Sequence, residues 1–149
     1  MNNTAKSKQE YAPDSYGWVG VDLDGTLAMY HGFKSYEDIG EPIPAMMARV
    51  KSWIAAGIDV RIFTARASDG PIATRPIARW LKRQGLPALR ITNVKDADCV
   101  EVWDDRAVTV VSNTGEPAGG AGETSRIAEL LLRQSTVVWR GYDNEGDED

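Results

Sequence analysis

Strand-like and helix-like segments alternate along this chain, and this alternation restricts its fold more than any other feature. An apolar run suited to a buried strand, WVGVDL, begins at Trp18, and residues 43–57 repeat apolar side chains on one helical face before Gly57. Further strands are expected at 58–66, 88–93, 100–105 and 107–111, and further helices at 75–84, capped by Thr74, and at 125–134. The alternation predicts an α/β fold, a Rossmann-like three-layer α/β/α sandwich around a mainly parallel central sheet.

The chain of 149 residues suits one domain, which would bury roughly 70% of the surface that its unfolded form exposes. Hydrophobic residues make up 42% of it, which is typical of a globular protein. We expect a flexible arm at residues 1–15, the folded domain at 16–141 and an acidic tail at 142–149. No apolar run approaches the roughly 20 residues that cross a bilayer, so no membrane partner is expected.

The chain has one cysteine, Cys99, and one histidine, His31. A single cysteine excludes an internal disulfide and suits a reducing cytoplasm, where we expect the protein to reside. Zinc sites favour cysteine and histidine ligands, so this composition argues against zinc. A metal bound by this chain must therefore be held by carboxylates.

The net charge of −5 is concentrated at the end of the chain, where residues 143–149 carry five acidic side chains and no basic one. The rest of the chain is therefore close to neutral. Within it, residues 59–90 are locally basic, with seven Lys or Arg side chains against the two acids Asp59 and Asp69. Such a pattern is typical of a solvated helix face, and the alternative is a surface that binds a polyanion.

Residues suited to chemistry follow four of the predicted strands. They are Asp22, Asp24, Gly25 and Thr26 after the first strand, Thr64, Ala65 and Arg66 after the second, Lys95 after the third, and Asp104, Asp105 and Arg106 after the fourth. Ligands of open parallel sheets bind beyond the carboxyl ends of the strands, so we expect these residues to converge at one edge. Because side chains two apart on a strand point the same way, Asp22 and Asp24 can face one centre. Hard carboxylate oxygens near cations predict a site for Mg²⁺ and a phosphoryl group.

The stretch DLDGTL at 22–27 resembles the first motif of the haloacid dehalogenase (HAD) superfamily, whose hydrolases mostly cleave phosphomonoesters. Thr64 matches the hydroxyl residue of the second motif, Lys95 the lysine of the third, and Asp104 with Asp105 the acidic pair of the fourth. The likeness covers residues 18–111. It is similar to small HAD proteins of bacteria and phages that lack a cap domain, and to the phosphatase domain of polynucleotide kinase–phosphatases.

The resemblance implies a Mg²⁺-dependent phosphatase in which Asp22 attacks phosphorus and forms an aspartyl-phosphate. Asp24 would be the general acid and base. The metal would be held by Asp22, the backbone carbonyl of Asp24 and an acid of the Asp104–Asp105 pair. The residues implied around the phosphoryl group and substrate are Gly25, Thr26, Thr64, Ala65, Arg66 and Lys95.

Two connections bear on the substrate. Only a few residues separate the strands expected at 88–93 and 100–105, whereas a parallel crossover normally needs about a dozen, so Lys95 is expected on an abbreviated loop. Residues 28–42 are too few for a cap domain. The site should therefore be open, unless a partner subunit of a homo-oligomer covers it. The resemblance implies a phosphorylated substrate, either a small molecule or a nucleic-acid end.

Three functions are open on the sequence. The first is a phosphomonoesterase of unspecified substrate. The second is a polynucleotide 3′-phosphatase or nucleotidase, for which the basic helix 75–83 could follow a phosphate backbone. The third is a catalytically retired HAD-like module for phosphate binding or assembly, against which the presence of Asp24 argues.

Overall fold

The computed structural model describes residues 17–119 together with Ile127, Leu131 and Arg133. Contacts divide the chain into two units, Met1–Arg106 and Ala107–Asp149. The boundary between them falls inside the domain that the sequence predicted at 16–141. The predicted arm at 1–15 and acidic tail at 142–149 lie outside the described residues.

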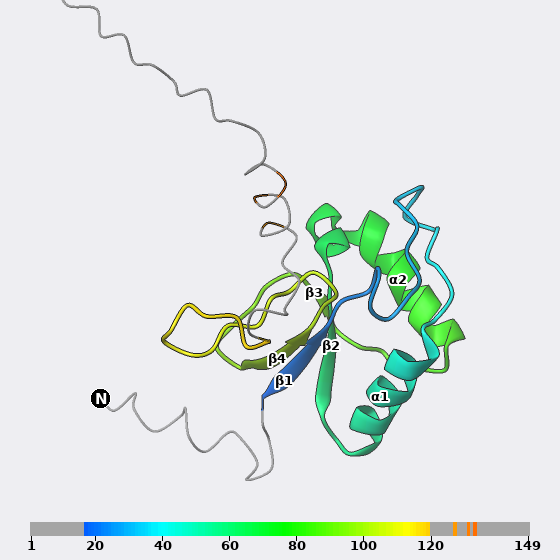
Figure 1. The fold of residues 1–149 in the computed structure, drawn as a ribbon. Helices are drawn as coiled ribbons and strands as arrows, with labels where there is room; N and C mark the ends of the chain where they lie inside the picture. The colour runs from blue at the N-terminus through cyan, green and yellow to red at the C-terminus, as the bar shows by residue number, and fades with distance from the viewer. Residues whose placement is uncertain (1–16, 120–126, 128–130, 132, 134–149) are drawn as a thin grey trace, which may run out of the picture. The chain divides into compact units, whose positions relative to one another are not determined.

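The first unit contains a four-stranded, entirely parallel sheet with the order β3-β2-β1-β4 (Figure 1). The strands are β1 (Trp18–Val21), β2 (Asp59–Phe63), β3 (Ile91–Thr92) and β4 (Cys99–Trp103). This arrangement confirms the predicted α/β class and the parallel, Rossmann-like sheet.

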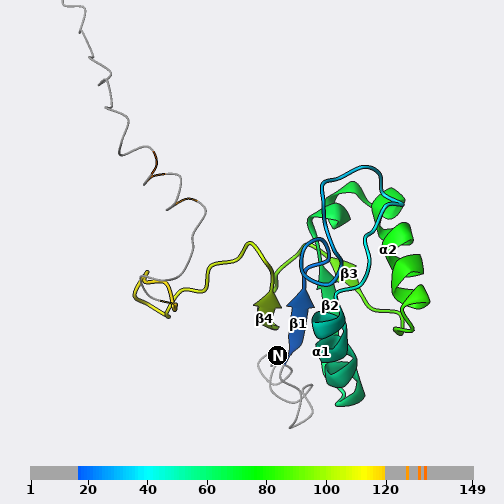
Figure 2. The ribbon, with the colours of Figure 1, turned by 45° about the vertical axis from the view of Figure 1, so that its right-hand side comes forward.

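Two α-helices, α1 (Pro44–Ala55) and α2 (Pro71–Arg83), lie on the same side of the sheet in both views of the ribbon (Figures 1 and 2). Alternate strand residues bury against them, because successive side chains of a strand point to opposite faces. The core joins Val19, Val21, Val60 and Ile62 of the sheet to Met46, Met47 and Val50 of α1 and Ile77, Trp80 and Leu81 of α2. Each large aliphatic side chain in such a core contributes about 1.5–3 kcal/mol by burial.

Helix α2 begins earlier than the sequence predicted. It starts at Pro71 instead of after Thr74, because a proline at the first helical position has its backbone angle preset for a helix. Pro76 lies inside the helix and is buried. Its ring removes one backbone donor from the helix.

The other face of the sheet carries Trp18, Arg61 and Phe63. Residues 93–98, the connection from β3 to β4, reach this face, where Trp18 Nε1 donates a hydrogen bond of 2.7 Å to Asp96. Six extended residues can span roughly 20 Å, which is enough to cross three strand spacings of about 4.8 Å each. The connection returns across the sheet in the opposite direction to the two helical crossovers. A right-handed path therefore takes it over the opposite face.

A third layer of helix is not found among the described residues of the first unit. The helix predicted at 125–134 belongs to the second unit, where the structure describes Ile127, Leu131 and Arg133 as helical. Ile127 and Leu131 are both exposed.

The strand predicted at 107–111 is absent from the sheet. Val110 instead forms an isolated bridge with Pro117, and Ala118 N–H donates to the carbonyl of Thr109 at 2.7 Å. A short hairpin therefore follows Arg106. Over the described part of the chain, no helix has both the length and the apolar character that spanning a membrane requires.

Candidate active site

The carboxyl ends of β1 and β4 meet where the order of the sheet changes direction, because β2 and β3 lie on one side of β1 and β4 lies on the other. Such a switch point opens a crevice at the edge of a parallel sheet. Asp22 follows β1, and its N–H donates to the carbonyl of Trp103 at 2.9 Å. Asp104 follows β4, so the sheet itself brings these two carboxylates together.

Asp22, Asp104 and Asp105 form a cluster in which one carboxylate oxygen from each lies within 4.8 Å of the others. Burial, together with the negative charge of the neighbouring Asp104, raises the pKa of Asp22 from its usual 3.8 to about 7. Negative charge is therefore crowded at this point. A cation would relieve the repulsion, and carboxylate oxygens are the ligands that Mg²⁺ prefers. The cluster fits the metal that the sequence predicted.

The turn after β1 supports this cluster. Gly25 has a φ of 88°, and a side chain there would meet a carboxylate oxygen of Asp105 at 2.6 Å. Only glycine fits that backbone and that space. Thr26 holds Asp105 in place, because its hydroxyl donates to Asp105 Oδ1 at 3.3 Å and accepts from the Asp105 N–H at 3.0 Å.

Gly25 and Thr26 therefore build the acidic cluster and do not line the pocket beside it. The N–H of Gly25 donates to the carbonyl of Ala28 at 2.8 Å, and that of Thr26 to Leu23 at 3.3 Å. Both backbone donors are already used inside the turn. The contact with phosphate that the resemblance implied for these two residues stays a prediction.

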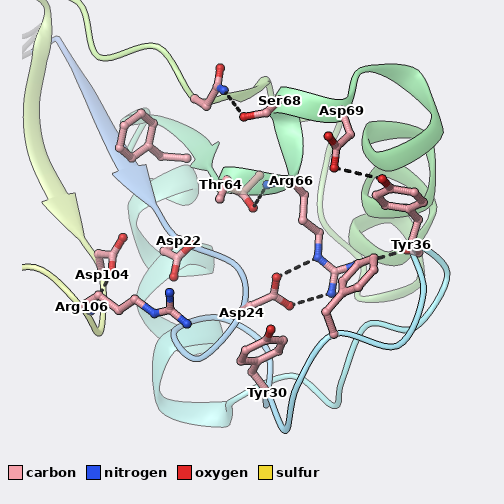
Figure 3. Close-up of a pocket in the computed structure, with 14 residues that line it drawn as sticks. Asp22, Asp24, Tyr30, Tyr36, Thr64, Arg66, Ser68, Asp69, Asp104 and Arg106 are labelled. Atoms are coloured by element: carbon pink, nitrogen blue, oxygen red, sulfur yellow. Dashed lines mark hydrogen bonds and ion pairs between the residues drawn. The ribbon is translucent and has the colours of Figure 1, made fainter.

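Asp24 points away from the acidic cluster and toward Arg66 (Figure 3). The guanidinium of Arg66 forms a two-pronged ion pair with it, at 2.7 Å from Nε and 2.9 Å from Nη2. The Asp24 carboxylate is thus not a member of the cluster. The metal contact implied for its backbone carbonyl stays a prediction.

Arg66 is buried, and it also donates to three backbone carbonyls of the loop between β1 and α1. These acceptors are Ser35 at 3.5 Å, Tyr36 at 3.3 Å and Asp38 at 3.1 Å. One side chain therefore fixes both the orientation of Asp24 and the course of the loop above it.

Replacing Arg66 by alanine is expected to lower the free energy of unfolding by about 3 kcal/mol. The change leaves the Asp24 carboxylate without its partner in a partly buried place, which is the costly way to break an ion pair. Urea unfolding of both proteins measures the difference. The matched control is Arg79→Ala, whose ion pair with Glu37 is exposed on both sides and should contribute less than about 1 kcal/mol. Equal losses in the two variants would contradict this account of Arg66.

Thr64 and Ala65 lie where β2 ends. Thr64 is buried, and its hydroxyl accepts a hydrogen bond of 3.2 Å from the N–H of Arg66, which caps the short 3₁₀ helix η1 (Ala65–Asp69). Both residues line a pocket of about 620 Å³ at the carboxyl edge of the sheet. The predicted site residues that share this pocket are Asp22, Asp24, Thr64, Ala65, Arg66 and Asp104.

Lys95 is not among the residues that line the pocket. It is exposed on the 93–98 connection, which leaves the carboxyl edge toward the start of β4. Asn93, at the beginning of that connection, lines the pocket instead, and its side-chain amide donates to Ser68 at 2.8 Å. The cations that line the pocket, among the described residues, are Arg66 and Arg106.

The sequence analysis did not identify the aromatic side of this pocket. Tyr30, Phe33 and Tyr36 come from the loop between β1 and α1, and Phe63 ends β2. The spacing of these three loop residues, with an aromatic side chain at every third position, was a signal available in the sequence. Arg106, whose side chain extends toward Asp22 and Asp24 in Figure 3, was considered for phosphate binding, and it lines the pocket.

Comparisons with known proteins do not assign the chain to a family. No family model matches it, and no curated protein matches it. A similar solved structure is described as "Structure of the conserved protein coded by locus from Bacteroides thetaiotaomicron", with 20% sequence identity and a TM-score of 0.48. The match covers 79% of this chain and 91% of that one. Similarity at this level assigns neither a family nor a function.

Proposed function

We propose that this protein is a Mg²⁺-dependent phosphomonoester hydrolase of the HAD type, which acts through an aspartyl-phosphate on Asp22. The observation that carries the proposal is the cluster of Asp22, Asp104 and Asp105, whose carboxylate oxygens lie within 4.8 Å at the switch point of the sheet. The cluster lies beside a pocket whose lining includes the hydroxyl of Thr64 and two guanidinium groups. The order of the motifs along the sequence supports the same reading.

The metal would be held by Asp22 with Asp104, Asp105 or both. When bound, Mg²⁺ would offset the repulsion between the carboxylates and a phosphate and draw charge from the phosphoryl oxygens. The crowding that raises the pKa of Asp22 would be relieved at the same time.

The chemistry of the protein residues follows in two steps. A carboxylate oxygen of Asp22 attacks phosphorus, the bond from phosphorus to the ester oxygen breaks, and Asp24, which enters this step protonated, gives its proton to the leaving oxygen. Water then attacks the phosphorus of the aspartyl-phosphate while Asp24 takes a proton from it. Inorganic phosphate leaves, and the free carboxylate of Asp22 is restored.

Arg66 would act in this scheme as a positioning residue. Its ion pair sets the direction of the Asp24 carboxylate, and its burial keeps that direction fixed. Thr64 would hold a phosphoryl oxygen through its hydroxyl. Arg106 would supply the positive charge that the resemblance gave to Lys95.

A substrate panel with phosphate release as the readout tests the proposal. The panel includes nucleotides, sugar phosphates, phosphotyrosine and a 3′-phosphorylated oligonucleotide, each with Mg²⁺ and with EDTA. We expect metal-dependent release from at least one class. Activity confined to the oligonucleotide would favour the polynucleotide 3′-phosphatase, and no release from any substrate would favour the retired module.

A further inference from the structure

The pocket beside the acidic cluster has an aromatic side that the hydrolysis step does not use. Phe33 and Tyr30 both line it, and their exposed fractions are 53% and 37%. Exposed large apolar side chains that gather in a pocket mark a binding surface more often than isolated ones do. The question is what kind of group they bind.

The ring of Phe33 is exposed, yet it is held by its neighbours. The guanidinium carbon of Arg66 lies over it, 5.3 Å from the ring centroid. The ring of Tyr36 meets it edge-on, with centroids 5.3 Å apart and an interplanar angle of 68°. Tyr36 is itself fixed, because its hydroxyl donates to Asp69 at 3.0 Å.

A ring held by neighbours and still half exposed is a ready stacking surface. Its orientation is set before a ligand arrives, so little conformational entropy is lost on binding. Nucleobases stack on such rings whatever their sequence, since every base has a π face.

We propose that the pocket binds a nucleotide, with the base stacked on Phe33 and the phosphate at Asp22. This inference rests on the proposed phosphatase function and names its substrate class. Ser68 and Asn93, which line the same pocket, offer polar groups for the sugar or the edge of the base.

The spacing within the pocket favours a nucleotide over a phosphotyrosine. Arg66 contacts Asp24 on one side and the Phe33 ring on the other, so an ion pair separates the stacking surface from the reacting carboxylates. A nucleotide has a sugar between its phosphate and its base, and that sugar can span this separation. In phosphotyrosine the ring is bonded directly to the ester oxygen, and no sugar is present to span this separation.

The kinetic test compares adenosine 5′-monophosphate with ribose 5-phosphate, which has the same sugar and phosphate but no base. We expect kcat/KM to favour the nucleotide by about tenfold or more, which corresponds to about 1.4 kcal/mol. Phe33→Leu keeps an apolar side chain but removes the π face, and it should reduce the preference to less than about threefold. Phe33→Trp restores a π face and should restore the preference. Ile72→Ala, an exposed apolar position on α2 outside the pocket, is the matched control and should leave the preference unchanged.

A binding test separates this inference from the proposed function. Calorimetry with the Asp22→Asn protein measures affinity for the same two ligands without turnover. If the nucleotide binds more tightly but wild-type protein releases no phosphate, the nucleotide site stands and the phosphatase is overturned. If both compounds are hydrolysed with equal kcat/KM, the phosphatase stands and the nucleotide inference is overturned. Three further results would overturn the nucleotide inference. They are a preference for the nucleotide that survives Phe33→Leu, a kcat/KM for phosphotyrosine above that for the nucleotide, and equal binding of the two ligands without hydrolysis.

Discussion

Asp22→Asn is expected to reduce phosphate release by at least about 10³-fold, because the amide cannot form the aspartyl-phosphate. The remaining interactions of the pocket can still bind and orient a substrate, so KM should change much less than kcat. Steady-state phosphate release on the best substrate of the panel measures both. Turnover within about tenfold of the wild-type rate would show that Asp22 is not the nucleophile.

The same substitution should stabilise the protein at pH 8 when metal is removed. The pKa of Asp22 is raised to about 7 in the folded protein, from 3.8 when the group is unperturbed. Between about pH 4 and pH 7 the folded state therefore binds more protons than the unfolded state, and stability falls as the pH rises through this window. Asparagine carries no charge, so the variant does not lose stability in this way as the pH rises.

Thermal unfolding in EDTA checks this sign. The melting temperature of Asp22→Asn should exceed that of the wild type by a few degrees at pH 8, and the difference should shrink toward pH 4. A difference that grows as the pH falls would contradict the crowding of charge around Asp22. A residue that is required for activity while it destabilises the fold is typical of an active site.

Replacing Asp104 and Asp105 together by alanine should weaken Mg²⁺ binding by at least about 100-fold and reduce activity in proportion. Two of the three clustered carboxylates are then lost, and a single Asp22 cannot hold the ion in the pocket. Calorimetric titration with Mg²⁺ measures the affinity. EDTA should abolish the activity of the wild type, and Ca²⁺ should inhibit it because its looser coordination spoils the in-line geometry.

The control for charge is the pair Glu41→Ala and Asp98→Ala, which removes the same formal charge from exposed positions. Its Mg²⁺ affinity should match that of the wild type. Unchanged affinity in the Asp104 and Asp105 variant would show that the metal binds elsewhere. Equal losses of affinity in both variants would show that the loss comes from net charge alone.

The sequence was sufficient to predict the acidic site because parallel strands impose a simple rule. Once Trp18–Val21 and Cys99–Trp103 are strands of one parallel sheet, the residues that follow them must share an edge. Asp22 and Asp104 meet for that reason alone. At Gly25 the structure shows a close approach that the sequence did not indicate, because Asp105 lies where a side chain would be.

What could not be predicted depends on tertiary contacts. The position of Lys95 follows from the path of the 93–98 connection over the second face of the sheet, which no local pattern indicates. The burial of Arg66 depends on carbonyls of residues 35–38, which are distant in sequence. Both α-helices lie on one face because β1, β2 and β3 follow one another in a single direction across the sheet, and that order could not be predicted from the sequence.

Detection of the covalent intermediate tests the central claim most directly. Wild-type protein is mixed with the best substrate and Mg²⁺, quenched in acid within one turnover, and digested for mass spectrometry. We predict one added phosphoryl group on the peptide that contains Asp22, at that residue, and its absence from Asp22→Asn. Rapid turnover with no phosphorylated peptide, or with the phosphoryl group on another residue, would contradict the proposed mechanism.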